Sequence, residues 1–468
     1  MPPMTDQSTR SLRGNLVFRA GKFTGWACNE DGDQTPVQVV AQPGNRVIWS
    51  GTPDEERPQS QVGSTEIGFS FAVPGSEVVA GNWIELRDGH GNSLTPKRSY
   101  IFTPDDEQWV PRLTKLANLP LLHFSSLNKA HIAAVHAIGN HESISQLQIS
   151  VENATGEHEL SADKIDIIPG QSDRLLGYFW FAPCWPNYAL RLDLASHFAD
   201  PLIDGGVPYV ILRIHEDGVS RPVTDRRDIG HVPADSVTWP DETSVRRTQA
   251  AGVLEQKFGS IGFSHYRTYR SVYEELGGTW DDMSALLDWG SGAGRVTQHY
   301  GRHLGWERVF GVDVDAENVK WCQEHLNLTS FSHCDVTPPL PYADETFDYI
   351  TATSVLTHIP GDMVDAWLDE LYRVLRPGGI AALSVGTETR VARGSYSNER
   401  LDMLEEKGYE DSIRNPQLNG VVDDADYYRN VRFSKDFIAK TWTKKFELVK
   451  IFDHAIGVQD IVALRKNA

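Results

Sequence analysis

A glycine-rich turn between a short apolar strand and a helix is the feature of this sequence most suited to chemistry. The apolar segment 284–289 is followed by Gly290-Ser291-Gly292-Ala293-Gly294, and a helical stretch begins at Arg295. Such a turn lets a ligand approach the backbone and meet the positive end of a helix. The dinucleotide fingerprint is GxGxxG, whereas Arg295 occupies the sixth position here. The spacing therefore disfavours a nicotinamide or flavin cofactor.

Acidic residues end the next two expected strands. The earlier of these two strands ends at Asp313, where a carboxylate can accept hydrogen bonds from both hydroxyls of a ribose. The alternative for Asp313 is a helix N-cap, but Asp315 stands closer to the next expected helix and suits that role better. The second strand ends at Asp335, which is placed to accept a hydrogen bond from an adenine amino group.

These residues need a framework of alternating strands and helices. Further strands are expected at 347–352 and 380–385, and the segment 362–375 between them has its apolar residues on one helical face. Pro377 and two following glycines end that helix. The alternation predicts a doubly wound α/β domain.

In this order, the motifs resemble those of the class I S-adenosylmethionine-dependent methyltransferases over about residues 246–468. The motifs are residues 287–294, Gly311-Val312-Asp313, Cys334-Asp335-Val336, Phe347-Asp348-Tyr349 and residues 371–379. The resemblance implies a Rossmann-like domain over residues 243–468 that ends in an antiparallel hairpin and binds S-adenosylmethionine. It implies that the glycine loop holds the methionine part of the cofactor, Asp313 the ribose and Asp335 the adenine. The cofactor-binding residues implied in this way are Asp288, Gly290, Ser291, Gly292, Gly294, Arg295, Asp313, Val314, Asp335, Val336 and Thr353.

Two residues are candidates for removing a proton from an acceptor hydroxyl. His358 follows the fourth strand at the mouth of the expected cofactor site, and an imidazole can act as a general base near neutral pH. Tyr428 lies in the long segment 386–440, where the resembling family places its substrate cover. Packing roles are the alternatives for both. Arg295 either forms a charge-assisted bond to the cofactor carboxylate or lies exposed in the first helical turn.

The N-terminal half consists of short alternating strands and turns. The pattern predicts β-sandwich-like modules over 12–105 and 118–215, and a polar linker over 216–242. An aromatic cluster within 178–185 could stack on sugar rings or fill a core. Gly25-Trp26-Ala27 and the segment 67–71 give the first module a loose resemblance to β modules of bacterial surface-polysaccharide enzymes. The expected fold is therefore multidomain.

Composition narrows the partners and the compartment. The chain has 44 Lys and Arg against 64 Asp and Glu, a net charge of −20, which disfavours nucleic acid as a partner. The four cysteines lie far apart and no metal-ligand spacing is present, so no metal is expected. No apolar run approaches the ~20 residues of a membrane span, and Met1–Asn15 lacks the apolar core of a signal peptide. We therefore expect a cytoplasmic protein.

These observations lead to one expected function and two alternatives. The expected function is S-adenosylmethionine-dependent methyl transfer by an O-methyltransferase whose acceptor is a glycan or a surface-polysaccharide precursor. One alternative is an O- or N-methyltransferase with a small-molecule acceptor. The other is a catalytically inactive glycan-binding or assembly subunit. The β modules could also join copies of the chain into a homo-oligomer.

Overall fold

The computed structural model describes most of the 468-residue chain. The described residues are 13–19, 22–28, 34, 36–55, 68–73, 79, 82–94, 100–101, 121–128, 130–138, 141–169, 187–216, 219–222, 228–230, 238–241, 243–245, 255–387, 398–422, 427–456 and 459–467. The aromatic cluster predicted within 178–185 lies outside them.

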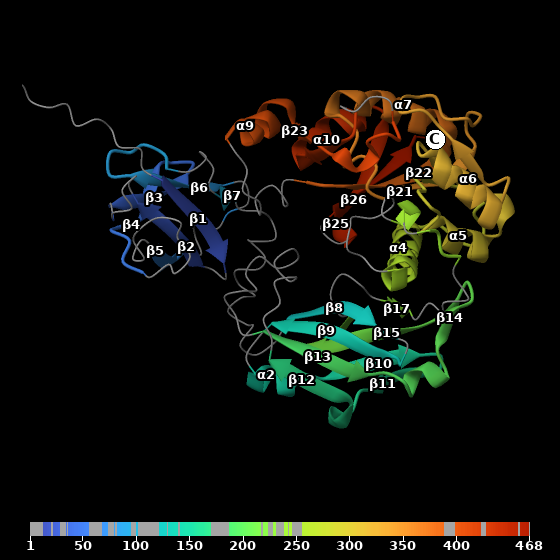
Figure 1. The fold of residues 1–468 in the computed structure, drawn as a ribbon, viewed down its shortest axis with the longest axis horizontal. Helices are drawn as coiled ribbons and strands as arrows, with labels where there is room; N and C mark the ends of the chain where they lie inside the picture. The colour runs from blue at the N-terminus through green and yellow to red at the C-terminus, as the bar shows by residue number, and fades with distance from the viewer. Residues whose placement is uncertain are drawn as a thin grey trace, which may run out of the picture.

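A seven-stranded sheet forms the centre of the C-terminal half (Figure 1). In spatial order its strands are β20 (Phe331–His333), β19 (Val309–Asp313), β18 (Leu286–Trp289), β21 (Phe347–Ala352), β22 (Leu375–Val385), β26 (Gln459–Lys466) and β25 (Phe446–Ile456). The first five strands are parallel, and β26 and β25 form an antiparallel hairpin. Because the strand order reverses at β18, a crevice for a ligand is expected at the carboxyl ends of β18, β19 and β21.

Helices cover both faces of this sheet. They are α4 (Glu255–Glu275), α5 (Thr297–Leu304), α6 (Ala316–His325), α7 (Val364–Val374) and α10 (Lys435–Thr441). Leu286 packs in one hydrophobic cluster with residues of α4 and α5, whereas the neighbouring Leu287 packs in a second cluster with α7 and α10. Neighbouring strand residues therefore reach opposite faces, as the predicted α/β architecture requires.

The predicted element boundaries of this domain are close to the observed ones. The helix expected over 362–375 begins with the 3₁₀ turn η7 (Gly361–Met363) and continues as α7. Asp315 caps α6, because its side chain accepts hydrogen bonds from the backbone N–H groups of Glu317 and Asn318. This contact confirms Asp315 rather than Asp313 as the helix cap.

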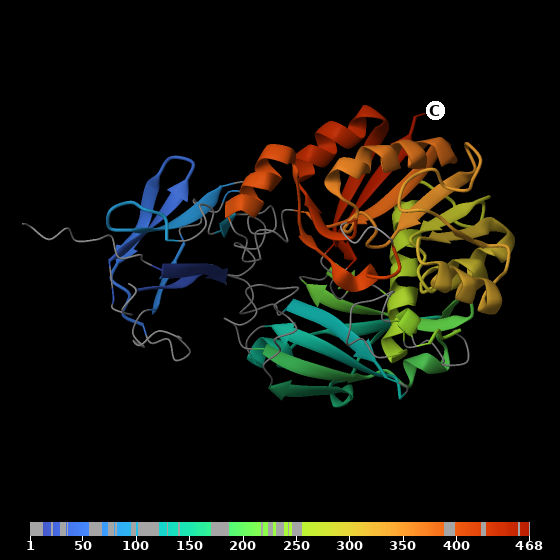
Figure 2. The same cartoon turned by 45° about the horizontal axis from the view of Figure 1, so that its top comes forward.

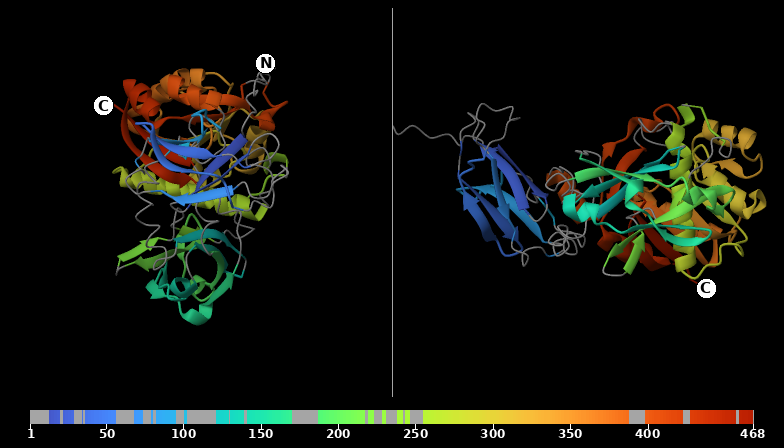
Figure 3. Two further views of the ribbon diagram at one scale, coloured as in Figure 1. Left: turned by 90° about the vertical axis from the view of Figure 1, so that its left-hand side faces the viewer. Right: turned by 90° about the horizontal axis from the view of Figure 1, so that it is seen from below.

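The first N-terminal module contains two sheets. Their strands are β1 (Arg13–Arg19), β2 (Lys22–Cys28) and β5 (Gly68–Ala72) in one, and β4 (Arg46–Gly51), β3 (Val37–Gln42), β6 (Trp83–Asp88) and β7 (Tyr100–Ile101) in the other. The right-hand view of Figure 3 shows these strands apart from the other sheets.

The second module also contains two sheets, joined by one hydrophobic cluster. One sheet has β12 (Ile165–Pro169), β13 (Asn187–Asp193), β9 (Ile132–Ile138) and β8 (Leu121–Leu127). The other has β11 (Gly156–Glu159), β10 (Ile149–Asn153), β15 (Val207–Glu216) and β14 (Leu202–Asp204). Val135 and Leu190 of the first sheet share this cluster with Val151 and Leu212 of the second, so the sheets pack on one another.

The segment 216–242, expected to be a linker, includes two short strands. β16 (Val219–Pro222) and β17 (Asp228–Gly230) both pair with β15 and extend the second module beyond residue 215. Strands of three or four residues are too short to show a periodic pattern in the sequence. This part of the linker prediction is therefore corrected.

None of the helices described by the structure has both the length and the apolar composition that crossing a membrane requires.

Candidate cofactor and acceptor site

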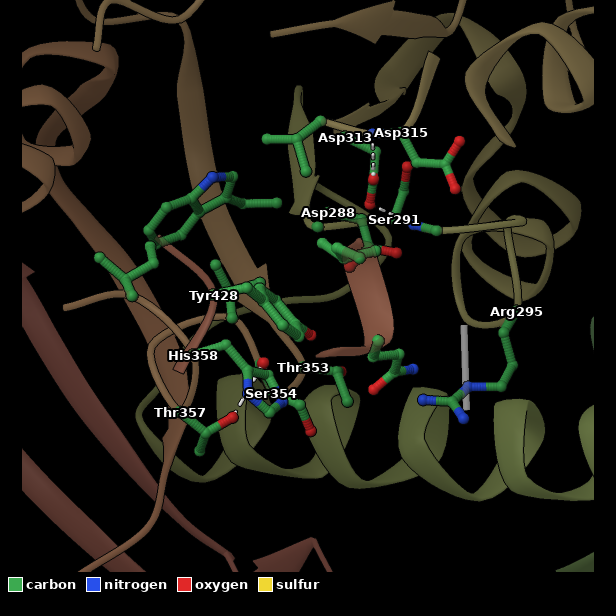
Figure 4. Close-up of a pocket in the computed structure, with 18 of the residues that line it drawn as sticks. Asp288, Ser291, Arg295, Asp313, Asp315, Thr353, Ser354, Thr357, His358 and Tyr428 are labelled. Atoms are coloured by element: carbon green, nitrogen blue, oxygen red, sulfur yellow. Dashed lines mark hydrogen bonds between the residues drawn. The ribbon is translucent and has the colours of Figure 1, made fainter. Parts of the chain in front are cut away.

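A cavity of about 600 Å³ lies at the carboxyl ends of β18, β19 and β21. Its walls come from the glycine-rich loop, α4 and the segment after β22. In Figure 4, Asp288, Ser291 and Asp313 lie on one side, and His358, Ser354 and Thr357 on the other. The volume falls within the range of about 300–1,000 Å³ that is typical of small-molecule sites.

The glycine-rich loop is held against the end of β19. Gly290 and Ser291 donate backbone hydrogen bonds to the carbonyl of Val312, with N···O distances of 2.8 and 3.1 Å. Gly290 has a φ of 76°, and a Cβ atom there would lie 2.3 Å from Cγ2 of Val355. Only glycine fits this conformation and this spacing, which explains the loop composition. The bare backbone lines the cavity and leaves room for a ligand.

Asp313 presents a carboxylate to the cavity from the tip of β19. Its Oδ2 accepts the N–H of Gly292 at 2.7 Å, and its Oδ1 accepts the N–H of Asp315 at 2.8 Å. Burial raises the pKa of this carboxyl to about 6. Each carboxylate oxygen can accept more than one hydrogen bond, so the fixed group can still receive both hydroxyls of a ribose.

Asp288 and Arg295 supply opposite charges at the same cavity. Oδ2 of Asp288 accepts the hydroxyl of Thr297 at 2.6 Å, and burial raises the pKa of Asp288 to about 6. Arg295 lines the cavity, and burial lowers the pKa of its guanidinium to about 10. The structure thus excludes the exposed position for Arg295. A guanidinium here is suited to a ligand carboxylate.

Three residues implied by the resemblance do not line this cavity. Gly294 packs toward α6, because a Cβ atom there would lie 2.4 Å from Cδ1 of Leu326. Asp335 is exposed, and Val336 packs against the hydrophobic core. The other implied residues do line the cavity: Asp288, Gly290, Ser291, Gly292, Arg295, Asp313, Val314 and Thr353.

His358 is held in one tautomer at the cavity wall. Its Nδ1 lies 2.8 Å from the carbonyl oxygen of Arg429, and a carbonyl only accepts, so Nδ1 carries the proton. Burial lowers the pKa of His358 to about 4, which leaves the ring neutral near pH 7. No described residue makes a hydrogen bond to Nε2. The lone pair on this nitrogen can accept a proton.

Tyr428 also lines the cavity but is unsuited to the base role considered from the sequence. Burial, followed by the nearby charge of Asp313, raises the pKa of its phenol above the ordinary value of about 10. A phenol that stays protonated at neutral pH donates hydrogen bonds rather than removing protons. His358 is therefore the better candidate of the two.

No sequence motif indicated several of the residues that line the cavity. Helix α4 contributes Ile261 and His265, and the region around β23 (Tyr409–Arg414) and β24 (Arg429–Phe433) contributes Asn415, Gln417, Asn430 and Arg432. The length of the segment 386–440 indicated a substrate cover, but isolated amides carry no motif that would single them out.

Among the described residues, no group of His, Cys, Asp or Glu side chains could hold a metal ion.

The cavity residues fit S-adenosylmethionine. The bare glycine backbone, the Asp313 carboxylate and the Arg295 guanidinium match the methionine chain, the ribose and the amino-acid carboxylate of this cofactor, respectively.

Comparisons with known proteins agree with this fit. Residues 287–383 match the family model described as a methyltransferase domain. Methyltransferase GfsG of Streptomyces halstedii is 30% identical over 155 residues, which are 31% of this chain and 48% of that protein. The ubiquinone/menaquinone biosynthesis C-methyltransferase UbiE of Hydrogenovibrio crunogenus is 28% identical over 153 residues, 30% of this chain and 58% of that protein. The chain thus covers less than two thirds of either relative.

A solved structure is similar at low identity. The 1,6-didemethyltoxoflavin-N1-methyltransferase of Burkholderia thailandensis, with bound 1,6-didemethyltoxoflavin and S-adenosylhomocysteine, has 17% identity and a TM-score of 0.32. The likeness covers 45% of this chain and 80% of that one. The family match and the cavity together identify the region that includes residues 287–383 as an S-adenosylmethionine-dependent methyltransferase domain.

Proposed function

We propose that the chain is an O-methyltransferase that acts on a hydroxyl of a glycan or a surface-polysaccharide precursor. The observation that carries the O-methyl assignment is the neutral His358, whose Nε2 faces no described hydrogen-bond partner at the cavity wall. A hydroxyl is a weak nucleophile until its proton is removed, and a positioned imidazole performs that step.

Each part of the cavity has a defined task in this proposal. S-adenosylmethionine, when bound, supplies the methyl group. Asp313 and the 290–294 loop orient the cofactor, and Arg295 binds its carboxylate. His358 takes the acceptor proton at Nε2, while its Nδ1–H bond to the Arg429 carbonyl fixes the ring. Tyr428 and Leu418 close the cavity against water.

The glycan assignment is supported by the two β-rich modules. We infer that they are β-sandwich-like and related to modules of surface-polysaccharide enzymes, and that they hold an extended acceptor next to the cavity or join two copies of the chain. A module that binds weakly raises the local concentration of its tethered acceptor. The cytoplasm remains our prediction for the compartment.

A small-molecule acceptor is the second candidate. The relative named for ubiquinone and menaquinone biosynthesis supports it, as does the cavity volume of about 600 Å³. The third possibility, an inactive subunit, is disfavoured because Asp313, Asp288 and the loop glycines all retain the geometry described above.

Calorimetry with the full chain tests the cofactor, and labelled methyl transfer tests the acceptor. We expect heat on addition of S-adenosylmethionine or S-adenosylhomocysteine and none with NAD. Label from S-adenosylmethionine should enter lipopolysaccharide fractions or oligosaccharides in preference to small phenols and quinols. Label in the phenols or quinols alone would select the second candidate, and no heat with either sulfur compound would overturn the proposal.

A further inference from the structure

Asp204 of the second β module is buried against the methyltransferase domain. It ends β14, in the turn that leads to β15. Its Oδ1 accepts the hydroxyl of Tyr266 at 2.6 Å and Nδ1 of His303 at 2.7 Å. Its Oδ2 accepts Nη1 of Arg270 at 3.0 Å and also pairs with Arg267. One carboxylate of the module thus binds three side chains of α4 and one of α5.

Apolar contacts surround this polar centre. Val207 and Tyr209 of β15 belong to the same buried cluster as Phe263 and Tyr266 of α4. The guanidinium of Arg267 lies 4.7 Å from the ring centroid of Tyr209. Figure 2 shows α4, in yellow-green, against the strands of the second module. The hairpin and the helix therefore pack as one unit rather than as two tethered domains.

The same helix forms a wall of the cofactor cavity. Ile261 and His265 of α4 line the cavity together with Arg295. Gly262 lies so close to the Arg295 backbone that a Cβ atom would meet its carbonyl oxygen at 2.1 Å. Tyr269 donates its hydroxyl to the carbonyl of Ala352, at the end of β21, at 2.7 Å. A small displacement of α4 must therefore move atoms that line the cavity.

The Asp204 cluster is a strong constraint on α4. Burial opposes the charge of Asp204, but the hydrogen bonds from His303 and Tyr266 and the charges of Arg267 and Arg270 lower its pKa below the ordinary value. Removing one partner of a buried ionic cluster leaves the others without their counter-charge. Asp204 itself does not line the cavity, so any effect on a bound ligand must pass through α4 and α5.

We propose that Asp204 is a positioning residue for cofactor binding, through which the second β module fixes α4 against Arg295 and the 290–294 loop. The inference rests on the proposed function, in which this cavity binds S-adenosylmethionine. It makes the second module a part of the catalytic unit, in addition to any role in holding an acceptor.

The test measures S-adenosylmethionine binding and kinetics in full-length variants. Asp204→Asn keeps the side-chain volume but removes the negative charge that Arg267, Arg270 and His303 contact. Coupling between sites of this kind is commonly worth about 3- to 30-fold in affinity, so the dissociation constant should rise by that factor. KM for S-adenosylmethionine should rise with it, while kcat at saturating cofactor stays within about 3-fold, because His358 is untouched.

Glu152→Gln is the matched control. Glu152 pairs with Arg213 of the same module at 2.7 Å, on strands β10 and β15, and among the described residues it has no hydrogen bond or ion pair with α4. We expect its cofactor affinity to equal that of the wild type. If Asp204→Asn does not fold, Tyr266→Phe takes its place, because it removes only the hydroxyl that donates to Asp204. The dissociation constant for S-adenosylmethionine should rise in this variant too.

The outcomes separate the inference from the proposed function. If the wild-type chain binds no S-adenosylmethionine, the proposed function fails. If the wild type binds but folded Asp204→Asn, or Tyr266→Phe in its place, binds equally well, the inference alone is overturned. Equal losses in Glu152→Gln and Asp204→Asn would also overturn it, because general destabilisation of the module would then explain both.

Discussion

The imidazole of His358 stacks on the phenol ring of Tyr428, with ring centroids 4.3 Å apart and 23° between the planes. The neighbouring backbone reinforces this contact, since Arg429 accepts Nδ1–H of His358 and donates its own N–H to the His358 carbonyl at 3.0 Å. The candidate base and the start of β24 are thus held as one assembly. The position of Nε2 depends on a segment distant in sequence.

Replacing His358 should slow catalysis without changing cofactor binding. We expect His358→Ala to lower kcat by about 10²–10⁴, the usual contribution of a general base, with an unchanged dissociation constant for S-adenosylmethionine. Tyr428→Phe is the control, because it keeps the stacked ring and removes only the hydroxyl. Steady-state kinetics and calorimetry check both variants. A lower melting temperature of His358→Ala with nearly normal kcat would make His358 a packing residue.

We expect kcat and KM for S-adenosylmethionine to depend on pH in different ways. His358 has a pKa of about 4, so Nε2 is unprotonated above that pH and kcat at saturating cofactor should stay level down to about pH 5. Asp288 and Asp313 have pKa values of about 6, so they take up protons as pH falls through 6. KM for S-adenosylmethionine should therefore rise below pH 6. A fall of kcat centred near 6.5 would contradict the burial of His358.

The sequence predicted the residues whose position follows from strand order, and missed those placed by tertiary contacts. The 290–294 loop and Asp313 follow parallel strands, so their meeting at one sheet edge could be foreseen. The docking of Asp204 on α4 could not, because alternating apolar residues in β15 do not indicate which surface covers them. The amides of the cover could not be singled out either, because Asn415, Gln417 and Asn430 lie in or beside elements too short to show a periodicity.

Asp313 and Asp335 should differ in their effect on cofactor binding. Asp313→Asn exchanges one carboxylate oxygen for an amide NH₂, so the ribose hydroxyls and the N–H groups of Gly292 and Asp315 compete for fewer acceptors. We expect a loss of about 1–3 kcal/mol in binding free energy. Asp335→Asn, at an exposed position outside the cavity lining, should change it by less than about 0.5 kcal/mol. Equal losses would restore Asp335 to the adenine site.

The contact between the second module and the methyltransferase domain should weaken as the pH rises above 6.5. The hydrogen bond to Asp204, followed by that to Asp281, raises the pKa of His303 above its ordinary value of 6.5. A raised pKa means that protonated His303 stabilises the folded state fully below pH 6.5, and that this stabilisation is lost as pH rises through the folded-state pKa. The melting temperature of the wild type relative to His303→Gln should fall across that window. A constant difference would contradict the prediction.

Removing the first β module tests acceptor choice without disturbing the catalytic unit. The hydrophobic clusters of the second module and the methyltransferase domain include none of its described residues, whereas a deletion reaching residue 215 would remove Asp204 and Tyr209 from the α4 contact. We therefore expect a chain lacking residues 1–105 to bind S-adenosylmethionine as the full chain does.

That shortened chain should still methylate a short saccharide with an unchanged KM, because such an acceptor does not reach from the cavity to the first module. KM for a polymeric glycan should rise, since the tethered module no longer raises the local concentration of the acceptor. Labelled methyl transfer onto both substrates gives the two KM values side by side. If both chains methylate a small phenol or quinol efficiently and neither labels a glycan, the first module has no part in acceptor binding and the small-molecule assignment replaces the glycan one.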